Sequence, residues 1–171
     1  MELISRLNEW EASLIRRLVP ETRASWDSAM VALTRLGDGW LWGLVVLGAL
    51  YDHSPRFLAA GAMACTIANL AFLTIKRVTG RERPCHAHRD LPTLVSARDY
   101  YSFPSGHSIN AFAATAVLEA MLWPAIGPLL FVVAFGVAVS RVYLRLHYPT
   151  DVLIGAVLGR VIGAVALLTT L

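Results

Sequence analysis

Long apolar stretches separated by short polar breaks run through most of this chain. A helix that crosses a bilayer needs about 20 predominantly apolar residues. Five stretches reach that length, and we expect a spanning helix at each of residues 28–51, 57–78, 105–123, 125–144 and 151–171. The pattern therefore predicts an all-α fold, a multi-pass transmembrane helical bundle of about five spans.

Turn-forming residues mark the ends of these predicted spans. They lie at residues 52–55 (Asp-His-Ser-Pro), 123–124 (Trp-Pro) and 147–150 (His-Tyr-Pro-Thr). The longest polar segment covers residues 77–103. Because a loop of this length is uncommon in a small compact domain, we expect it to be functional.

Residues 2–18 predict a further helix. Leu3, Leu7, Trp10, Leu14 and Leu18 recur every three or four positions, and charged residues occupy the other faces. The segment is too charged to span a membrane. We expect an amphipathic helix in the membrane interface, and an ordinary helix packed on the bundle remains an open alternative. Residues 1–27 are then interfacial helix and linker, residues 28–171 are the bundle, and the whole chain is one domain.

The composition excludes most other classes of protein. Of the 171 residues, 56% are hydrophobic and 16% charged, against roughly 25% charged in an average soluble domain. Two cysteines are too few for a disulfide scaffold of this size. The net charge of +3 comes mainly from cations that flank apolar runs. This arrangement favours anionic headgroups or phosphates as partners over nucleic acid.

Three reactive clusters fall on one side of the membrane when the spans alternate in direction. They occupy residues 76–84, 104–107 and 140–151. Pro-Ser-Gly-His at the start of a helix can bind an anion, because helix N-termini carry unpaired amides and partial positive charge. There Gly106 permits close approach of an oxyanion, Ser105 can cap or donate, and His107 faces the ligand.

The other two clusters supply charge and a nucleophile. Lys76, Arg83 and Arg141 carry permanent positive charge, and arginine can bind a phosphate through two donors. His147 and Asp151 are four residues apart, so the carboxylate can hold one ring nitrogen while the other attacks. Two histidines, a carboxylate and three cations around an oxyanion site indicate phosphoryl transfer.

Three spaced motifs together resemble a known family. The motifs are Lys-x6-Arg-Pro at Lys76, Arg83 and Pro84; Pro-Ser-Gly-His at residues 104–107; and Ser-Arg-x5-His-x3-Asp at Ser140, Arg141, His147 and Asp151. They match, in order and without departure, the signatures of the type 2 phosphatidic acid phosphatase (PAP2) superfamily. The chain resembles a small integral-membrane lipid phosphate phosphatase of that family.

The resemblance implies catalysis without a metal or other cofactor. It implies that His147 is the nucleophile and forms a phosphohistidine, that Asp151 orients it, and that His107 protonates the leaving oxygen and then activates water. The implied phosphate-binding residues are Lys76, Arg83, Ser105, Gly106 and Arg141. Since His107 must start protonated and His147 neutral, a bell-shaped pH profile is expected.

The substrate is left open among several lipid phosphates. Candidates are a polyprenyl phosphate or pyrophosphate, phosphatidylglycerol phosphate, phosphatidic acid and a lipid A phosphate. The superfamily also holds large soluble vanadate-binding haloperoxidases, which this short apolar chain does not resemble in size. A non-enzymatic transporter or scaffold for an anionic lipid is the alternative, although it has no need of two histidines and an aspartate together.

Several other polar residues raise separate expectations. Cys85, His86, His88 and Asp90 are metal-ligand types, but their spacing matches no standard zinc pattern. We expect them to line the headgroup entrance. Isolated charges deep in a span are costly, and we expect Glu119 in the third span and Arg160 in the fifth to form a structural pair. Arg35 and Asp38 are expected to serve the site or the interface.

The membrane and its side complete the prediction. We expect the cell (inner) membrane, with the site near its surface. The side with the reactive clusters is rich in arginine, whereas the opposite side shows only Arg56. The positive-inside rule therefore indicates a cytoplasmic site. Most bacterial proteins of the family that the chain resembles face the periplasm, so both sides stay open, as does the oligomeric state.

Overall fold

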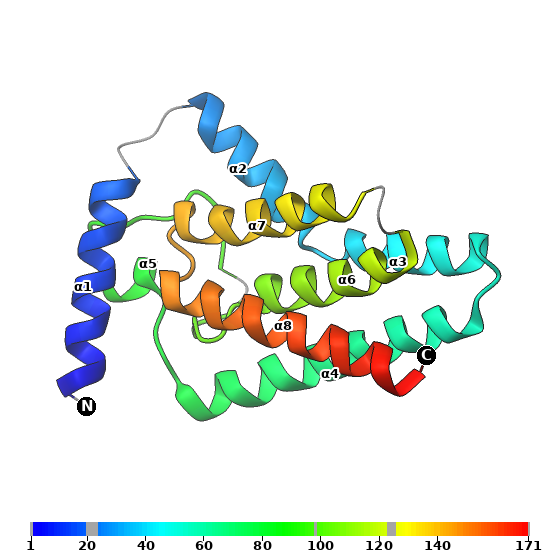
Figure 1. The fold of residues 1–171 in the computed structure, drawn as a ribbon. Coiled ribbons are helices and arrows are strands. Elements are labelled where there is room, and N and C mark those ends of the chain that lie inside the picture. The colour runs from blue at the N-terminus through cyan, green and yellow to red at the C-terminus, as the bar shows by residue number, and fades with distance from the viewer. Residues whose placement is uncertain (1, 20–23, 98, 123–125, 171) are drawn as a thin grey trace.

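The computed structural model describes residues 2–19, 24–97, 99–122 and 126–170. Its helices are α1 (Glu2–Leu18), α2 (Ala24–Leu36), α3 (Trp40–Tyr51), α4 (Pro55–Thr79), α5 (Pro84–Ala87), α6 (Gly106–Leu122), α7 (Gly127–Tyr143) and α8 (Pro149–Thr170). The all-α prediction is confirmed over this part of the chain. Figure 1 shows α3, α4, α6, α7 and α8 lying roughly side by side, with α1 across one end of the bundle.

Four predicted spans correspond to single helices. Residues 57–78, 105–123, 125–144 and 151–171 agree to within a few residues with α4, α6, α7 and α8. The predicted turn at 123–124 lies outside the described residues. Among the residues that are described, α4 and α8 are individually long and apolar enough to cross a membrane, and α7 is a shorter apolar helix. The number of about five spans stays a prediction.

The prediction of one continuous helix over residues 28–51 is wrong. The chain bends by 48° between α2 and α3, which are long and apolar enough to cross a membrane only as a pair. Residues 37–39 interrupt the helix, and Gly39 has a φ of 111°, a conformation that favours glycine. A Cβ on Gly37 would lie 2.8 Å from the ring of His107. The break therefore brings the backbone at residues 37–39 against the start of α6.

A row of glycines lets α8 pack directly on the backbone of α6. A Cβ on Gly155 would lie 2.9 Å from the carbonyl oxygen of Ser105, and one on Gly163 would lie 2.9 Å from that of Ala113. At Gly159 a Cβ would collide with the carbonyl oxygen of Ile109. Small residues spaced four apart permit this close approach between membrane helices. The packing places the start of α8 beside the start of α6, where the Ser105 N–H donates to the Asp151 carbonyl at 3.1 Å.

Helix α1 packs on the bundle with a face that its apolar stripe did not predict. Ala12 and Ile15 are buried in a cluster with Tyr148. By contrast, Trp10 and Leu18, which belong to the predicted stripe, are exposed. The helix therefore docks on the protein and still presents apolar side chains outward. The structure supports the alternative of a packed helix, and the interfacial location of α1 stays a prediction.

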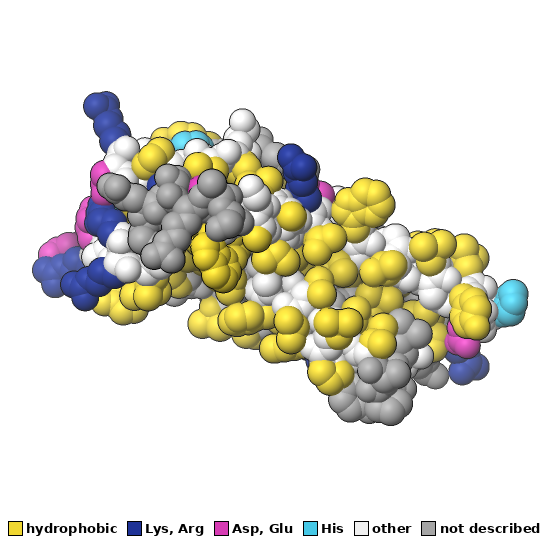
Figure 2. Space-filling model, turned by 90° about the horizontal axis from the view of Figure 1, so that it is seen from above, with side chains coloured by type: hydrophobic (Ala, Val, Ile, Leu, Met, Phe, Trp, Pro, Cys, Tyr) yellow, Lys and Arg dark blue, Asp and Glu magenta, His cyan; other side chains and the backbone are white. Residues whose placement is uncertain are grey.

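The outer surface separates apolar from charged residues. Figure 2 shows charged side chains gathered at one end of the molecule, a smaller group at the other end, and mostly hydrophobic side chains between them, with a few charged ones at the upper edge. Exposed apolar residues such as Leu47, Leu70 and Phe135 come from the long helices. Arg160 of α8 donates to Glu119 of α6 at 2.6 Å. The predicted interhelical pair is therefore confirmed.

We predict that Gly159→Ala destabilises the protein although alanine favours helices by about 1 kcal/mol over glycine. The added methyl group collides with backbone of α6, and such overpacking costs about 1–3 kcal/mol. Gly43→Ala is the matched control, because a Cβ at this helical position in α3 meets nothing within 4 Å. Thermal unfolding in detergent should show a lower midpoint for Gly159→Ala alone. Equal midpoints for the two variants would contradict the packing argument.

Candidate active site

A cavity of about 530 Å³ opens where the reactive clusters meet. Its walls come from the break between α2 and α3, from α4, α6 and α7, and from the loops before α6 and α8. Six of the eight predicted site residues line it: Lys76, Arg83, Gly106, His107, Arg141 and His147. Ser105 and Asp151 are fully buried behind this wall. The structure thus brings segments more than 60 residues apart into one polar cavity.

Arg83 connects the loop before α5 to the loop before α8. Its Nη1 donates to the Leu146 carbonyl and lies near Nε2 of His147, both at 2.9 Å. Its Nε donates to the Asp99 carbonyl at 2.7 Å, and Nη2 donates to the Asp99 carboxylate at 3.0 Å. These bonds hold the planar guanidinium in one orientation. It is therefore preorganised beside the nucleophile predicted from the sequence.

Asp99 is a site residue that the sequence motifs do not include. Its two carboxylate oxygens accept from Lys76 Nζ at 3.1 and 3.0 Å, in addition to the bond from Arg83. Burial acts to raise the pKa of Asp99, but the hydrogen bond from Lys76 and the charge of Arg83 outweigh it, and the pKa of the carboxyl is lowered. An ionised Asp99 thus aligns two cations. Asp99 belongs to none of the three spaced motifs, and only the fold shows its role.

Arg141 supplies the third cation from the last turn of α7. Its side chain is buried, and Nη1 donates to Thr34 Oγ1 of α2 at 2.5 Å. The chain then turns sharply, with Arg145 at a φ of 59°. This turn lets the N–H of His147 donate to the Arg141 carbonyl at 3.2 Å. The spacing of Arg141 and His147 thus follows from a tight turn that places both at the cavity.

The Pro-Ser-Gly-His segment forms the start of α6 as expected. The Ser105 hydroxyl accepts from the Ser108 N–H at 3.3 Å and from the Ser108 hydroxyl at 3.0 Å, so it caps the helix. Gly106 lines the cavity, and a Cβ there would lie 3.2 Å from the Phe72 ring. The two residues therefore differ in placement. Gly106 borders the cavity, whereas Ser105 shapes the helix end behind it.

His107 pairs with a carboxylate from the break between α2 and α3. Its Nε2 lies 2.9 Å from Asp38 Oδ1, and both residues line the cavity. Because a carboxylate can only accept, this contact orients the His107 ring with Nε2 as the donor. The sequence placed Asp38 in the middle of a span, and the bend brings it to the site. Arg35 also lines the cavity. The sequence left open whether Arg35 and Asp38 serve the site or the interface, and both lie at the site.

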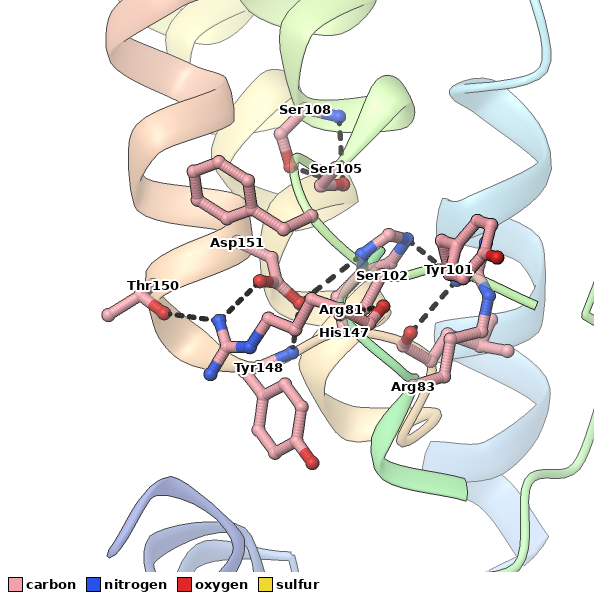
Figure 3. Close-up of polar contacts among 12 residues, drawn as sticks. Arg81, Arg83, Tyr101, Ser102, Ser105, Ser108, His147, Tyr148, Thr150 and Asp151 are labelled. Atoms are coloured by element: carbon pink, nitrogen blue, oxygen red, sulfur yellow. Dashed lines mark hydrogen bonds and ion pairs between the residues drawn. The ribbon is translucent and has the colours of Figure 1, made fainter. Parts of the chain in front are cut away.

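His147 is held between a cation and a carboxylate (Figure 3). Since a guanidinium can only donate, the bond with Arg83 makes Nε2 the accepting nitrogen of the ring. The proton of the neutral ring then lies on Nδ1, which is 3.7 Å from Asp151 Oδ2. Burial, with the charges of Arg83 and Arg141, holds the pKa of His147 well below its usual value. The ring is therefore neutral, with its lone pair directed at the guanidinium.

Asp151 is fixed by contacts on both of its oxygens. Oδ2 accepts from the Tyr148 N–H at 2.8 Å, and Oδ1 accepts from Arg81 Nη1 at 2.6 Å. Arg81 belongs to the first cluster but has no role in the spacing motifs. Its side chain is buried, with 9% exposed. The sequence motifs therefore identify Asp151 but do not identify Arg81, the cation that holds it.

The inner wall of the cavity is also polar. Trp42 Nε1 donates to Asn110 Oδ1 at 2.8 Å, and Asn69 Nδ2 lies 3.4 Å from the same oxygen. All three residues line the cavity. They come from α3, α4 and α6, at positions that read as plain apolar spans. The cavity therefore offers polar contacts beyond the cluster of cations.

The Cys-His segment of the long loop does not form a cluster. His86 stacks on Tyr100, His88 packs edge-on against Tyr148, and Asp90 pairs with Arg16 of α1. Across the described residues, no three or more such side chains are grouped to hold a metal ion. None of Cys85, His86, His88 and Asp90 lines the cavity, so their expected place at the headgroup entrance finds no support here.

The arrangement is suited to transfer of an anionic group to an imidazole. Arg83 lies 2.9 Å from Nε2 of His147, and Lys76 and Arg141 line the same cavity. The three cations can bind the oxygens of a phosphoryl group there. A second histidine paired with a carboxylate faces the same cavity and can donate a proton. The groups lie in a partly enclosed site, where such charges act more strongly than in water. This chemistry corresponds to phosphoryl transfer.

We predict that His147 stays neutral below the usual pKa of a histidine, about 6.5. A group with a lowered pKa takes up its proton only at more acidic pH. In NMR spectra of the protein labelled with ¹³C on histidine, the resonance missing from His147→Asn should not titrate between pH 8 and 6.5. A midpoint above 6.5 for that resonance would show that the surrounding cations do not control the ring.

Comparisons with known proteins agree with this chemistry. Residues 57–170 match the PAP2 superfamily. The chain is 41% identical over 129 residues to decaprenylphosphoryl-5-phosphoribose phosphatase of Mycolicibacterium smegmatis, covering 72% of this chain and 68% of that protein. Its fold resembles the crystal structure of Aquifex aeolicus LpxE, with a TM-score of 0.80 at 24% identity over 91% and 93% of the two chains.

A second solved structure is also similar. It is the transmembrane PAP2-type phosphatidylglycerolphosphate phosphatase from Bacillus subtilis, with a TM-score of 0.76, 26% identity and coverage of 97% of this chain and 85% of that one. The matched segment contains all three motifs. It therefore includes Lys76, Arg83 and Arg141, the motif cations that line the cavity. On this basis the chain belongs to the PAP2 superfamily.

Proposed function

We propose that this protein is an integral-membrane lipid phosphate phosphatase that works through a phosphohistidine at His147. The observation that carries the proposal is the position of His147 Nε2. The nitrogen is buried and lies 2.9 Å from Arg83, a group that can only donate, inside a cavity with Lys76 and Arg141. A phosphoryl oxygen that binds Arg83 would bring phosphorus next to this lone pair.

In the first step the Nε2 lone pair of His147 attacks phosphorus. The bond from phosphorus to the leaving oxygen breaks, and this oxygen takes a proton from His107. The new positive charge on the His147 ring is stabilised by Asp151 through Nδ1–H. Lys76, Arg83 and Arg141 bind the other phosphoryl oxygens, with the Gly106 amide at the helix N-terminus.

In the second step His107, now neutral, removes a proton from water. The water oxygen attacks phosphorus, the phosphorus–nitrogen bond breaks, and its electron pair returns to Nε2 of His147. Inorganic phosphate leaves and His107 is protonated again. Asp38 supports this cycle because its carboxylate, 2.9 Å from His107 Nε2, holds the ring in place. Ser105 shapes the site through the start of α6.

We propose a substrate whose phosphate sits on a polar headgroup carried by a lipid. The cavity of about 530 Å³ continues past the cations to Trp42, Asn69 and Asn110, which could contact hydroxyl groups. A polyprenyl-linked phosphoribose is the first candidate, because a relative named for that substrate shares 41% identity. Polyprenyl phosphates and pyrophosphates, phosphatidylglycerol phosphate, phosphatidic acid and lipid A phosphates complete the panel.

In the membrane we propose a single domain with five spans, formed by the α2–α3 pair, α4, α6, α7 and α8. Helix α1 lies at the interface, and the lipid tail enters sideways between helices. We place the site on the cytoplasmic side of the inner membrane, following the excess of arginine around it. At the other end of the bundle, the turn at residues 52–54 faces the opposite side.

We predict that purified protein releases inorganic phosphate from at least one lipid of this panel, and that His147→Asn abolishes the release. The substitution removes the nucleophile and keeps a polar side chain of similar size. His53→Asn is the matched control, because His53 is exposed and far from the cavity, and asparagine tolerates its φ of 51°.

Trapping should also detect the intermediate. With a ³²P-labelled lipid, an acid-labile, base-stable label should appear on wild-type protein and on His53→Asn but not on His147→Asn. Tight lipid binding without phosphate release by wild-type protein would instead support a non-enzymatic transporter or scaffold for anionic lipids.

We predict that labelling of single cysteines places residue 97 in the cytoplasm and residue 54 outside. Ser54→Cys and Ala97→Cys are introduced singly after Cys65 and Cys85 are replaced by alanine. An impermeant maleimide applied to intact spheroplasts should then label position 54 alone. Labelling of position 97 and protection of position 54 would place the site in the periplasm.

A further inference from the structure

A second cluster of charges lies behind His147, on the side away from the cavity. Arg81 is at its centre, and the residue does not line the cavity. Its Nη1 donates to Asp151 at 2.6 Å and to Thr150 Oγ1 at 2.8 Å, and Nη2 donates to Glu11 at 2.5 Å and to Asn8 at 2.7 Å. The guanidinium also stacks 4.1 Å from the centre of the Tyr148 ring. One buried cation therefore bridges α1 and the start of α8.

Glu11 reaches this cluster from α1 and is fully buried. Its Oε1 accepts from the Thr150 N–H at 2.7 Å, and Oε2 accepts from the Thr150 hydroxyl at 2.9 Å. The Thr150 amide belongs to the first turn of α8, where backbone donors have no partner within the helix. A carboxylate there also interacts well with the helix dipole. Glu11 thus caps α8 from another helix while it binds Arg81.

Stability alone gives little reason for this arrangement. Two carboxylates and a guanidinium are withdrawn from water, and buried ion pairs of this kind commonly add little net stability. The contacts instead restrict the orientation of one group, the Asp151 carboxylate. Arg81 occupies Oδ1 of Asp151, so the other oxygen, Oδ2, is the one that faces Nδ1 of His147 at 3.7 Å. Rotation of the carboxylate would break the bond to Arg81.

We propose that Glu11 and Arg81 are positioning residues that hold Asp151 in the orientation needed by His147, so that α1 is a working part of the active site. The inference rests on the proposed function, in which Asp151 stabilises the charged His147 ring. Neither residue touches the phosphate cavity. Both act through Asp151: Arg81 by holding its carboxylate, and Glu11 by holding Arg81 and the first turn of α8.

The experiment compares Arg81→Gln, Arg81→Lys and Glu11→Gln with wild type and with Glu2→Gln. Glu2 is the matched control, because it is an exposed carboxylate on the same helix that pairs only with Arg6 among the described contacts. We expect kcat to fall about 100-fold in Arg81→Gln and about tenfold in Glu11→Gln, since small displacements of a catalytic group cost up to about 100-fold. KM and the inhibition constant of inorganic phosphate should not change, because the three cations that bind phosphate remain.

Arg81→Lys tests whether residue 81 must bind both carboxylates at once. A lysine keeps the charge but cannot bind both carboxylates through a planar fork, so we expect its kcat to lie between wild type and Arg81→Gln. Thermal unfolding in the same detergent measures any loss of folding. A lower unfolding midpoint with unchanged kcat per folded molecule would overturn the proposal, as would kcat values equal to that of Glu2→Gln.

A second readout does not require turnover. In the ¹³C-histidine spectra, the resonance of His147 should change position in Arg81→Gln and Glu11→Gln but not in Glu2→Gln. The charged groups that face His147 from the other elements, namely Lys76, Arg83, His107 and Arg141, are retained in all variants. If wild-type protein releases no phosphate but the resonance moves, the proposed function fails and the positioning of Asp151 stands. An unmoved resonance would overturn the positioning itself.

Discussion

The close contact between α6 and α8 is the constraint on which the site depends. Gly155, Gly159 and Gly163 allow the backbone of one helix to lie against the other, and a methyl group at any of them would meet a carbonyl oxygen of α6 or of Ser105, the residue before it. This contact fixes the two helix starts side by side, with Ser105 bonded to the Asp151 backbone. The second and third motifs are thereby joined. The residues of the first motif reach them through Arg83, which bonds to the loop that carries His147.

Charge is organised on two sides of His147. On the cavity side, the half-exposed Asp99 aligns Lys76 and Arg83, and Arg141 is held by Thr34. On the other side, Asp151 is held by Arg81, which binds Glu11 of α1. The cations facing the cavity keep the ring neutral, and the buried Asp151 carboxylate lies 3.7 Å from its Nδ1. The same ring can therefore accept phosphorus on one nitrogen while a negative charge balances the other.

Sequence patterns predicted the helices and the motif residues better than the contacts between them. Four of the five apolar runs located α4, α6, α7 and α8, and the expected pair of Glu119 and Arg160 is present. The break at residues 37–39 was missed because its polar residues are few and the surrounding run is apolar. Helix α1 was recognised, but its apolar stripe indicated the wrong contact face, since the buried face holds Glu11 beside Ala12 and Ile15. The spacing of apolar residues cannot identify a helix face whose buried contacts include ion pairs.

By itself the sequence determined the all-α class, the apolar composition of a membrane protein and the three motifs that mark the PAP2 superfamily. These features are local, because helix periodicity and motif spacing are set by neighbours along the chain. Only the tertiary structure decided that Asp38 meets His107, that Asp99 aligns two cations, and that Glu11 and Arg81 anchor Asp151. Each of these pairs joins residues from separate elements, 16 to 70 positions apart. Their contacts depend on how the helices pack, and no pattern within a single segment records that.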